Sequence, residues 1–92
     1  MKKRKSRIRT RADGSHIIDV GWVRIMRRRM RSLIRRGDYE QAHGGEDMIH
    51  QTVLREISRN TDLTLDQIRK LATAALRTQR IPFPRTCGPW EQ

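Results

Sequence analysis

The sequence has little of what a disulfide framework or a membrane span requires. It contains a single cysteine, Cys87, so no internal disulfide can form, which fits a reducing compartment. No uncharged apolar run approaches the roughly 20 residues of a membrane-spanning helix. The basic N-terminus is not followed by the apolar stretch of a secretory signal peptide. We therefore expect a cytoplasmic protein that is not bound to a membrane.

Patterns typical of catalysis and metal binding are also missing. No glycine-rich phosphate loop, nucleophile motif or arrangement of paired carboxylates is present. The residues that could bind a metal stand at none of the spacings that zinc sites use: His16, His43, His50 and Cys87. The sequence therefore predicts no catalytic site, no metal and no cofactor, and we do not expect an enzyme.

Acidic residues are almost absent from the first third of the chain. Residues 1–36 contain fourteen lysines and arginines but only two aspartates, whereas residues 37–92 contain seven basic and eight acidic residues. The net charge of +11 therefore originates in the first third. A charge block of one sign repels itself, so an anionic partner would stabilise it.

Residues 1–19 are expected to form a basic N-terminal arm. Residues 7–11 alternate arginine with isoleucine or threonine, as a strand does, and Asp13-Gly14 is a turn signal, which together indicate a short hairpin. An unstructured arm that becomes ordered on a phosphate backbone explains the same residues. The sequence leaves both interpretations open.

A first helix is predicted over residues 20–36, with Asp19 as its N-cap and Gly37 at its end. Its apolar positions fall in one broad arc that we expect to face the core: Val20, Trp22, Val23, Met26, Met30, Leu33 and Ile34. An adjoining arc is basic: Arg24, Arg28, Arg31 and Arg35, with Arg27 at its edge. No acidic residue lies on this helix, so ion pairs within it cannot relieve the repulsion.

Two further helices are predicted over residues 46–59 and 64–79, with residues 42–45 in a loop. Thr64 and Gln67 form a capping box, and Pro82 sets the latest possible end. The side chains expected to face inward are Ile49, Val53, Leu54 and Ile57, and then Leu65, Ile68, Leu71, Ala72, Ala75 and Leu76. Residues 81–92 are expected to form an extended, proline-containing tail whose Phe83 and Trp90 pack back on the core.

The fold class predicted from these elements is mainly all-α, with a three-helix domain over residues 20–80. The last two helices resemble a helix–turn–helix pair around the turn at residues 60–63, although that turn lacks the glycine such motifs often carry. In that interpretation the second helix presents side chains that can read base edges: Gln67, Arg69, Lys70, Thr73 and Arg77. A plain antiparallel helix hairpin accounts for the same pattern.

The expected function is nucleic-acid binding, with DNA favoured over RNA, as in a transcriptional regulator or accessory factor. The residues expected to contact nucleic acid are Lys2, Lys3, Arg4, Lys5, Arg7, Arg9, Arg11, Arg24, Arg27, Arg28, Arg31, Arg35, Gln67, Arg69, Lys70 and Arg77. With four aromatic residues, none among the basic clusters, a stacking platform for single strands is not expected.

Three other interpretations remain open. The protein could bind RNA or the ribosome, or it could bind an acidic surface of a larger enzyme and modulate it, because arginine pairs with carboxylates as well as phosphates. The amphipathic first helix could lie on a membrane surface. The width of its apolar arc also makes a homodimer possible.

Overall fold

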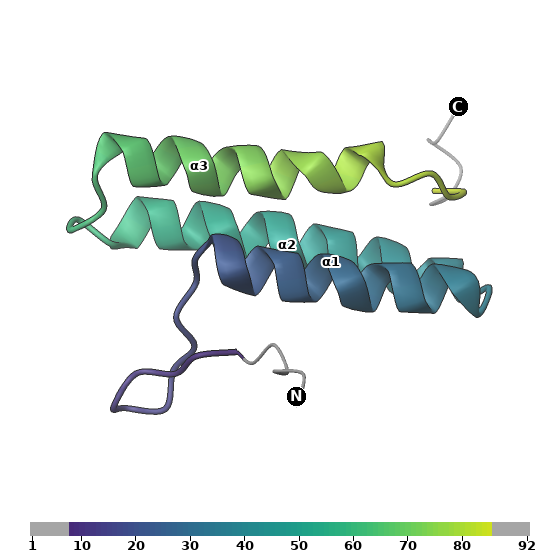
Figure 1. Ribbon diagram of the computed structural model, residues 1–92, viewed down its shortest axis with the longest axis horizontal. Helices are drawn as coiled ribbons and strands as arrows, with labels where there is room; N and C mark the ends of the chain where they lie inside the picture. Colours follow the sequence, from purple (N-terminus) through teal and green to yellow (C-terminus); the bar gives the residue numbers. More distant parts are fainter. Residues whose placement is uncertain (1–7, 86–92) are drawn as a thin grey trace, which may run out of the picture.

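Three α-helices form a bundle in the computed structural model, which describes residues 8–85 (Figure 1). Helix α1 spans Val20–Arg35, α2 spans Tyr39–Arg59 and α3 spans Leu65–Leu76, and a short 3-10 helix, η1 (Arg77–Arg80), follows α3 directly. Successive helices run in opposite directions, so α1 and α3 run the same way along α2. Each helix packs against the other two. The prediction of a small, mainly all-α domain of three helices is confirmed.

Local capping interactions set the helix ends. A carboxylate oxygen of Asp19 accepts a hydrogen bond from the Trp22 amide at 3.0 Å, and Gly37, with φ +79°, ends the turn after α1. The capping box forms in both directions, because the Thr64 hydroxyl accepts from the Gln67 amide at 3.1 Å and the Gln67 side-chain oxygen accepts from the Thr64 amide at 2.8 Å. These three predicted signals are confirmed.

Helix α2 begins at Tyr39, so the predicted start at residue 46 and the predicted loop over residues 42–45 are wrong. Asp38 provides an earlier N-cap, accepting from the Gln41 amide at 3.3 Å. Gly44 and Gly45 lie inside this helix, and each costs roughly 1 kcal/mol of helix stability relative to alanine. Packing opposes this cost: Ala42 is fully buried, and Gly45 lies against α1, where an added Cβ would stand 3.7 Å from Met30 Cγ.

The core lies where the three helices meet. Its buried apolar side chains are Trp22, Val23, Met26, Met30, Ala42, Ile49, Val53, Leu71, Ala74, Ala75 and Ile81. The predicted inward positions Leu54, Leu65 and Leu76 are wrong, since these side chains are 66%, 63% and 59% exposed. Leu33 is only half-buried. On each helix, the strip of buried side chains is therefore narrower than the predicted apolar arc.

The helix–turn–helix detail is not confirmed. Figure 1 shows α2 and α3 side by side over much of their length and running in opposite directions, as the helices of an antiparallel hairpin do. This is the plainer of the two arrangements that the sequence allowed.

The described part of the N-terminal arm forms a small hairpin. Thr10 and His16 make an isolated antiparallel bridge, and Gly14, with φ +89°, occupies the turn. The hairpin's basic residues have internal acidic partners: Arg9 pairs with Asp19, and Arg11 approaches a Glu56 carboxylate oxygen of α2 at 3.4 Å. The basic block is therefore partly neutralised within the fold. Lys2, Lys3, Arg4, Lys5 and Arg7 lie outside the described residues.

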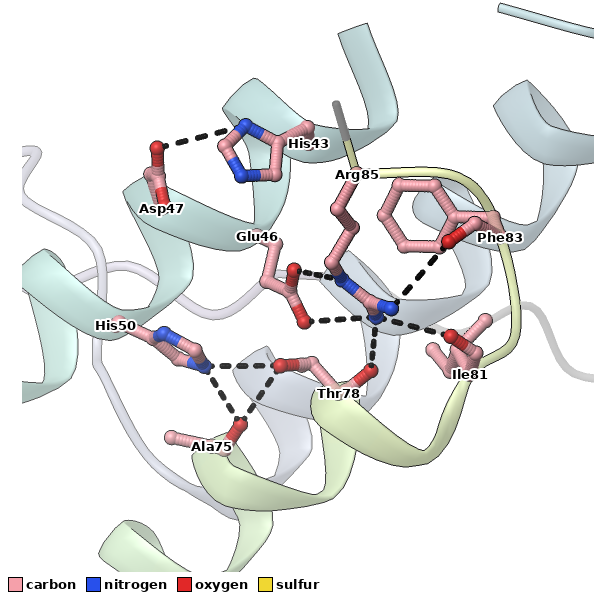
Figure 2. A network of polar contacts seen from close by, with 9 residues as sticks. All are labelled: His43, Glu46, Asp47, His50, Ala75, Thr78, Ile81, Phe83 and Arg85. Carbon is pink, nitrogen blue, oxygen red and sulfur yellow. Dashed lines mark hydrogen bonds and ion pairs between the residues drawn. The ribbon is translucent and has the colours of Figure 1, made fainter. Parts of the chain in front are cut away.

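The segment after η1 folds back onto α2 (Figure 2). The Arg85 guanidinium donates to both carboxylate oxygens of Glu46, at 2.7 and 3.1 Å, and to the carbonyls of Thr78 and Ile81. It also stacks over the Phe83 ring, 4.0 Å from its centroid. Phe83 packs against the core as predicted, and Trp90 lies outside the described residues.

Glu46 is 4% exposed, so its charge depends on these contacts. Burial acts to raise the pKa of its carboxyl group, but hydrogen bonds from Arg85 and Thr78, with the charges of Arg85 and His50, outweigh burial and lower the pKa below the ordinary 4.5. Glu46 and Arg85 therefore form a charged pair that joins the segment after η1 to α2. Between residues 8 and 85, no helix is long and apolar enough to cross a membrane.

Candidate functional site

A cavity of about 270 Å³ lies between α1 and α3. Its lining consists of Val20, Arg24, Arg69, Lys70, Thr73, Ala74 and Arg77. Four of these seven side chains are cationic and none is acidic. We call this cavity and its lining the basic cleft.

Helix geometry explains why these residues meet. Arg69, Thr73 and Arg77 are spaced four residues apart, so they share one face of α3 and its continuation into η1. Arg24 lies one turn after Val20 on α1, which runs beside α3 in the same direction. Ala74 is buried. The basic cleft therefore joins part of the arginine arc of α1 to the basic residues of α3, which the sequence could only treat separately.

Arg27 shows that the positive charge around the cleft is poorly compensated. Its Nε is buried and has no hydrogen-bond partner among residues 8–85. Burial, followed by the positive charges of Arg31, Arg77 and Arg24, lowers the pKa of its guanidinium group. Because arginine remains charged in proteins, the fold keeps this repulsion. An anion bound nearby would relieve it.

One cation of the cleft has an acidic neighbour. Lys70 Nζ lies 3.1 Å from an Asp66 carboxylate oxygen, one turn earlier on α3, and both side chains are more than two-thirds exposed. An exposed pair of this kind contributes roughly 0–1 kcal/mol and is screened by salt. It therefore balances one charge of the lining weakly.

The remaining predicted site residues between residues 8 and 85 fall into three groups. Arg28, Arg31 and Arg35 are exposed on α1 outside the lining, with Arg31 close enough to affect Arg27. Gln67 is engaged in the capping box. Arg9 and Arg11 have the acidic partners described above. Val20 and Ala74 were not predicted as site residues, because no pattern along the chain shows which apolar residues border a cavity.

The described residues provide no metal-binding cluster. No group of three or more histidine, cysteine, aspartate or glutamate side chains between residues 8 and 85 could hold a metal ion. His50 contacts both α3 and η1, with Nε2 at 3.1 Å from the Ala75 carbonyl oxygen and 2.9 Å from the Thr78 hydroxyl (Figure 2). His43 lies 3.8 Å from Asp47 on α2.

No protein-family model, curated protein or solved structure matches this chain. The function of the basic cleft is therefore inferred from its own side chains.

Proposed function

We propose that this protein binds nucleic acid, with duplex DNA favoured over RNA, and that it acts as a small regulator or accessory factor rather than as an enzyme. The observation that carries the proposal is the basic cleft, where Arg24 of α1 meets Arg69, Lys70 and Arg77 around one cavity with no acidic lining residue. Nucleic acids present the regular negative charge that such a surface attracts.

The chemistry of the cleft suits phosphate. Arginine presents a planar fork of donors that pairs with phosphate oxygens in two places at once, and three of the four lining cations are arginines. The exposed Arg28, Arg31 and Arg35 continue the basic surface along α1. Contacts to several successive phosphates would explain a basic surface longer than one cavity.

The aromatic residues favour a duplex over stacked single strands. Trp22 is buried. The rings of Tyr39 and Phe83 contact each other, with their centroids 6.5 Å apart. Arg85 covers Phe83 as well. Stacking on exposed aromatic rings is the usual means of binding single strands. Tyr39 is 41% exposed, but none of the three rings lines the cleft.

Replacing Arg24, Arg69 and Arg77 together by glutamine should weaken binding to duplex DNA and reduce its salt dependence. Each lost phosphate contact lowers the slope of log K against log salt by about 0.9, so the triple variant should lose about 2.7 in slope. Folding should be preserved, because glutamine is a good helix former and the substitutions remove repulsion near Arg27. Fluorescence anisotropy at several salt concentrations measures both quantities.

The matched control removes the same charge elsewhere. Arg29, Arg55 and Arg59 are exposed and do not line the cleft. A control variant that replaces these three arginines together by glutamine should keep most of the parent's affinity for duplex DNA. Equal losses in the two triple variants would contradict a role for the cleft. If neither DNA nor RNA binds the parent protein, the proposal fails and an acidic protein surface becomes the candidate partner.

A further inference from the structure

Three polar residues of α3 and η1 are exposed and line the cleft, which bears on what this part of the chain can recognise. The Gln67 side-chain oxygen is occupied by the Thr64 amide. Arg69, Thr73 and Arg77 line the cavity that α3 shares with α1. A helix that reads base edges presents such side chains outward to the groove. Here the exposed Arg69, Thr73 and Arg77 border a depression that α3 and η1 share with α1, so a ligand bound to them also meets Arg24.

The side chains that line the cleft offer many hydrogen-bond donors and few acceptors. Arginine and lysine side chains only donate hydrogen bonds, and the Thr73 hydroxyl is the one side-chain group of the lining that can also accept. A phosphate oxygen only accepts hydrogen bonds, and so do N7 and O6 of guanine, whereas adenine and cytosine also present donors in the major groove. The lining therefore matches groups that only accept, and phosphate oxygens are the acceptors that occur at every step of a nucleic-acid backbone.

The cleft is small and open to solvent. Its volume of about 270 Å³ lies just below the roughly 300–1,000 Å³ of pockets that enclose drug-sized ligands. Three or four cations around so small a space would be balanced by several singly charged backbone phosphates or by one multiply charged pyrophosphate.

We propose that the basic cleft is a discrete phosphate-binding site, which takes backbone phosphates of nucleic acid and also binds free pyrophosphate. The identification of nucleic acid as the source of the phosphate rests on the function proposed above. Two consequences follow from the site. Binding is indifferent to base sequence, because the cleft touches only the backbone, and an anion contacted by Arg24 and Arg77 joins α1 to the end of α3.

Thermal unfolding in sodium pyrophosphate, compared with sodium chloride at the same ionic strength, tests the site without nucleic acid. A ligand that binds only the folded state raises the midpoint in a saturable way. The parent should show this rise, and Arg77→Gln should weaken pyrophosphate binding about tenfold to a hundredfold, as the loss of charged hydrogen bonds does. The control Arg29→Gln should respond as the parent does. No rise beyond that in chloride, or an equal rise in all three proteins, would overturn the proposal.

Binding to two DNA duplexes of equal length and unrelated sequence separates this inference from the proposed function. Equal affinity for both duplexes, with pyrophosphate competing, supports the phosphate site. Binding that prefers one sequence and is not displaced by pyrophosphate overturns the phosphate site but leaves nucleic-acid binding in place. Pyrophosphate stabilisation that depends on Arg77, without binding to either duplex or to RNA, supports the phosphate site and overturns the nucleic-acid function.

Discussion

Replacing Leu71 by alanine is expected to lower the free energy of unfolding by about 2–5 kcal/mol, as truncation of buried leucines does. Leu71 is 2% exposed and belongs to the buried cluster in which α3 meets α1 and α2. Since small domains are stable by roughly 5–15 kcal/mol, this single change would remove a large share of the total. Urea unfolding followed by circular dichroism measures the difference.

Leu76→Ala is the control for Leu71→Ala, because it makes the same chemical change on the same helix. The Leu76 side chain is 59% exposed, so its truncation should change stability by less than about 0.5 kcal/mol. Similar losses at the two positions would mean that the face of α3 assigned to the core is wrong.

Arg85→Ala is expected to destabilise the protein by about 3–5 kcal/mol at neutral pH, because it leaves a buried carboxylate without its charged partner. Arg85 donates to both oxygens of Glu46, and the Glu46 side chain is 5% exposed. The variant also loses the hydrogen bonds to the Thr78 and Ile81 carbonyls. Chemical unfolding at pH 7 gives the size of the loss.

The effect of Arg85→Ala should depend on pH. Since the pKa of Glu46 is lowered in the fold, its ionised form adds stability above the unfolded-state value of 4.5, and this contribution disappears as the pH falls through the lowered folded-state pKa. The difference between parent and variant should therefore shrink below that range. Arg80→Ala, at an exposed position of η1, should show neither the loss nor the pH dependence. A difference that stays constant with pH would exclude the Glu46 charge as its cause.

The elements predicted correctly from the sequence depend on local chemistry. Asp19, Gly37 and the Thr64–Gln67 capping box act within one turn of the chain, so the residues themselves reveal the helix ends. The start of α2 was missed for the opposite reason. Gly44 and Gly45 disfavour a helix locally. The helix nevertheless continues through them, and Gly45 packs there against Met30 of α1, a contact that no local sequence pattern reveals.

Periodicity identified the apolar side of each helix but not how much of that side is covered. Val53 and Leu54 are neighbours on α2, yet Val53 is 2% exposed and Leu54 is 66% exposed. The width of the buried strip depends on how closely the neighbouring helices approach. That distance is a property of the bundle and not of one helix.

The candidate site shows the same limit. The cationic residues Arg24, Arg69 and Arg77 were predicted individually, but the basic cleft forms only where α1 and α3 pack against each other. Gln67 was predicted both to cap α3 and to contact nucleic acid, and only the capping role is seen in the fold. The pair of Glu46 and Arg85 was not predicted, because 39 residues separate them in the chain.

A titration of the isotope-labelled protein with duplex DNA, followed by backbone amide NMR, tests most directly whether the basic cleft binds nucleic acid. The largest chemical-shift changes should fall on residues 20–31 of α1 and on residues 69–77 of α3 and η1, which line or adjoin the cleft. The exposed positions Met48 and Leu54 of α2 should change little. Changes concentrated at those positions of α2, with the amides around the cleft unaffected, would contradict nucleic-acid binding at the basic cleft.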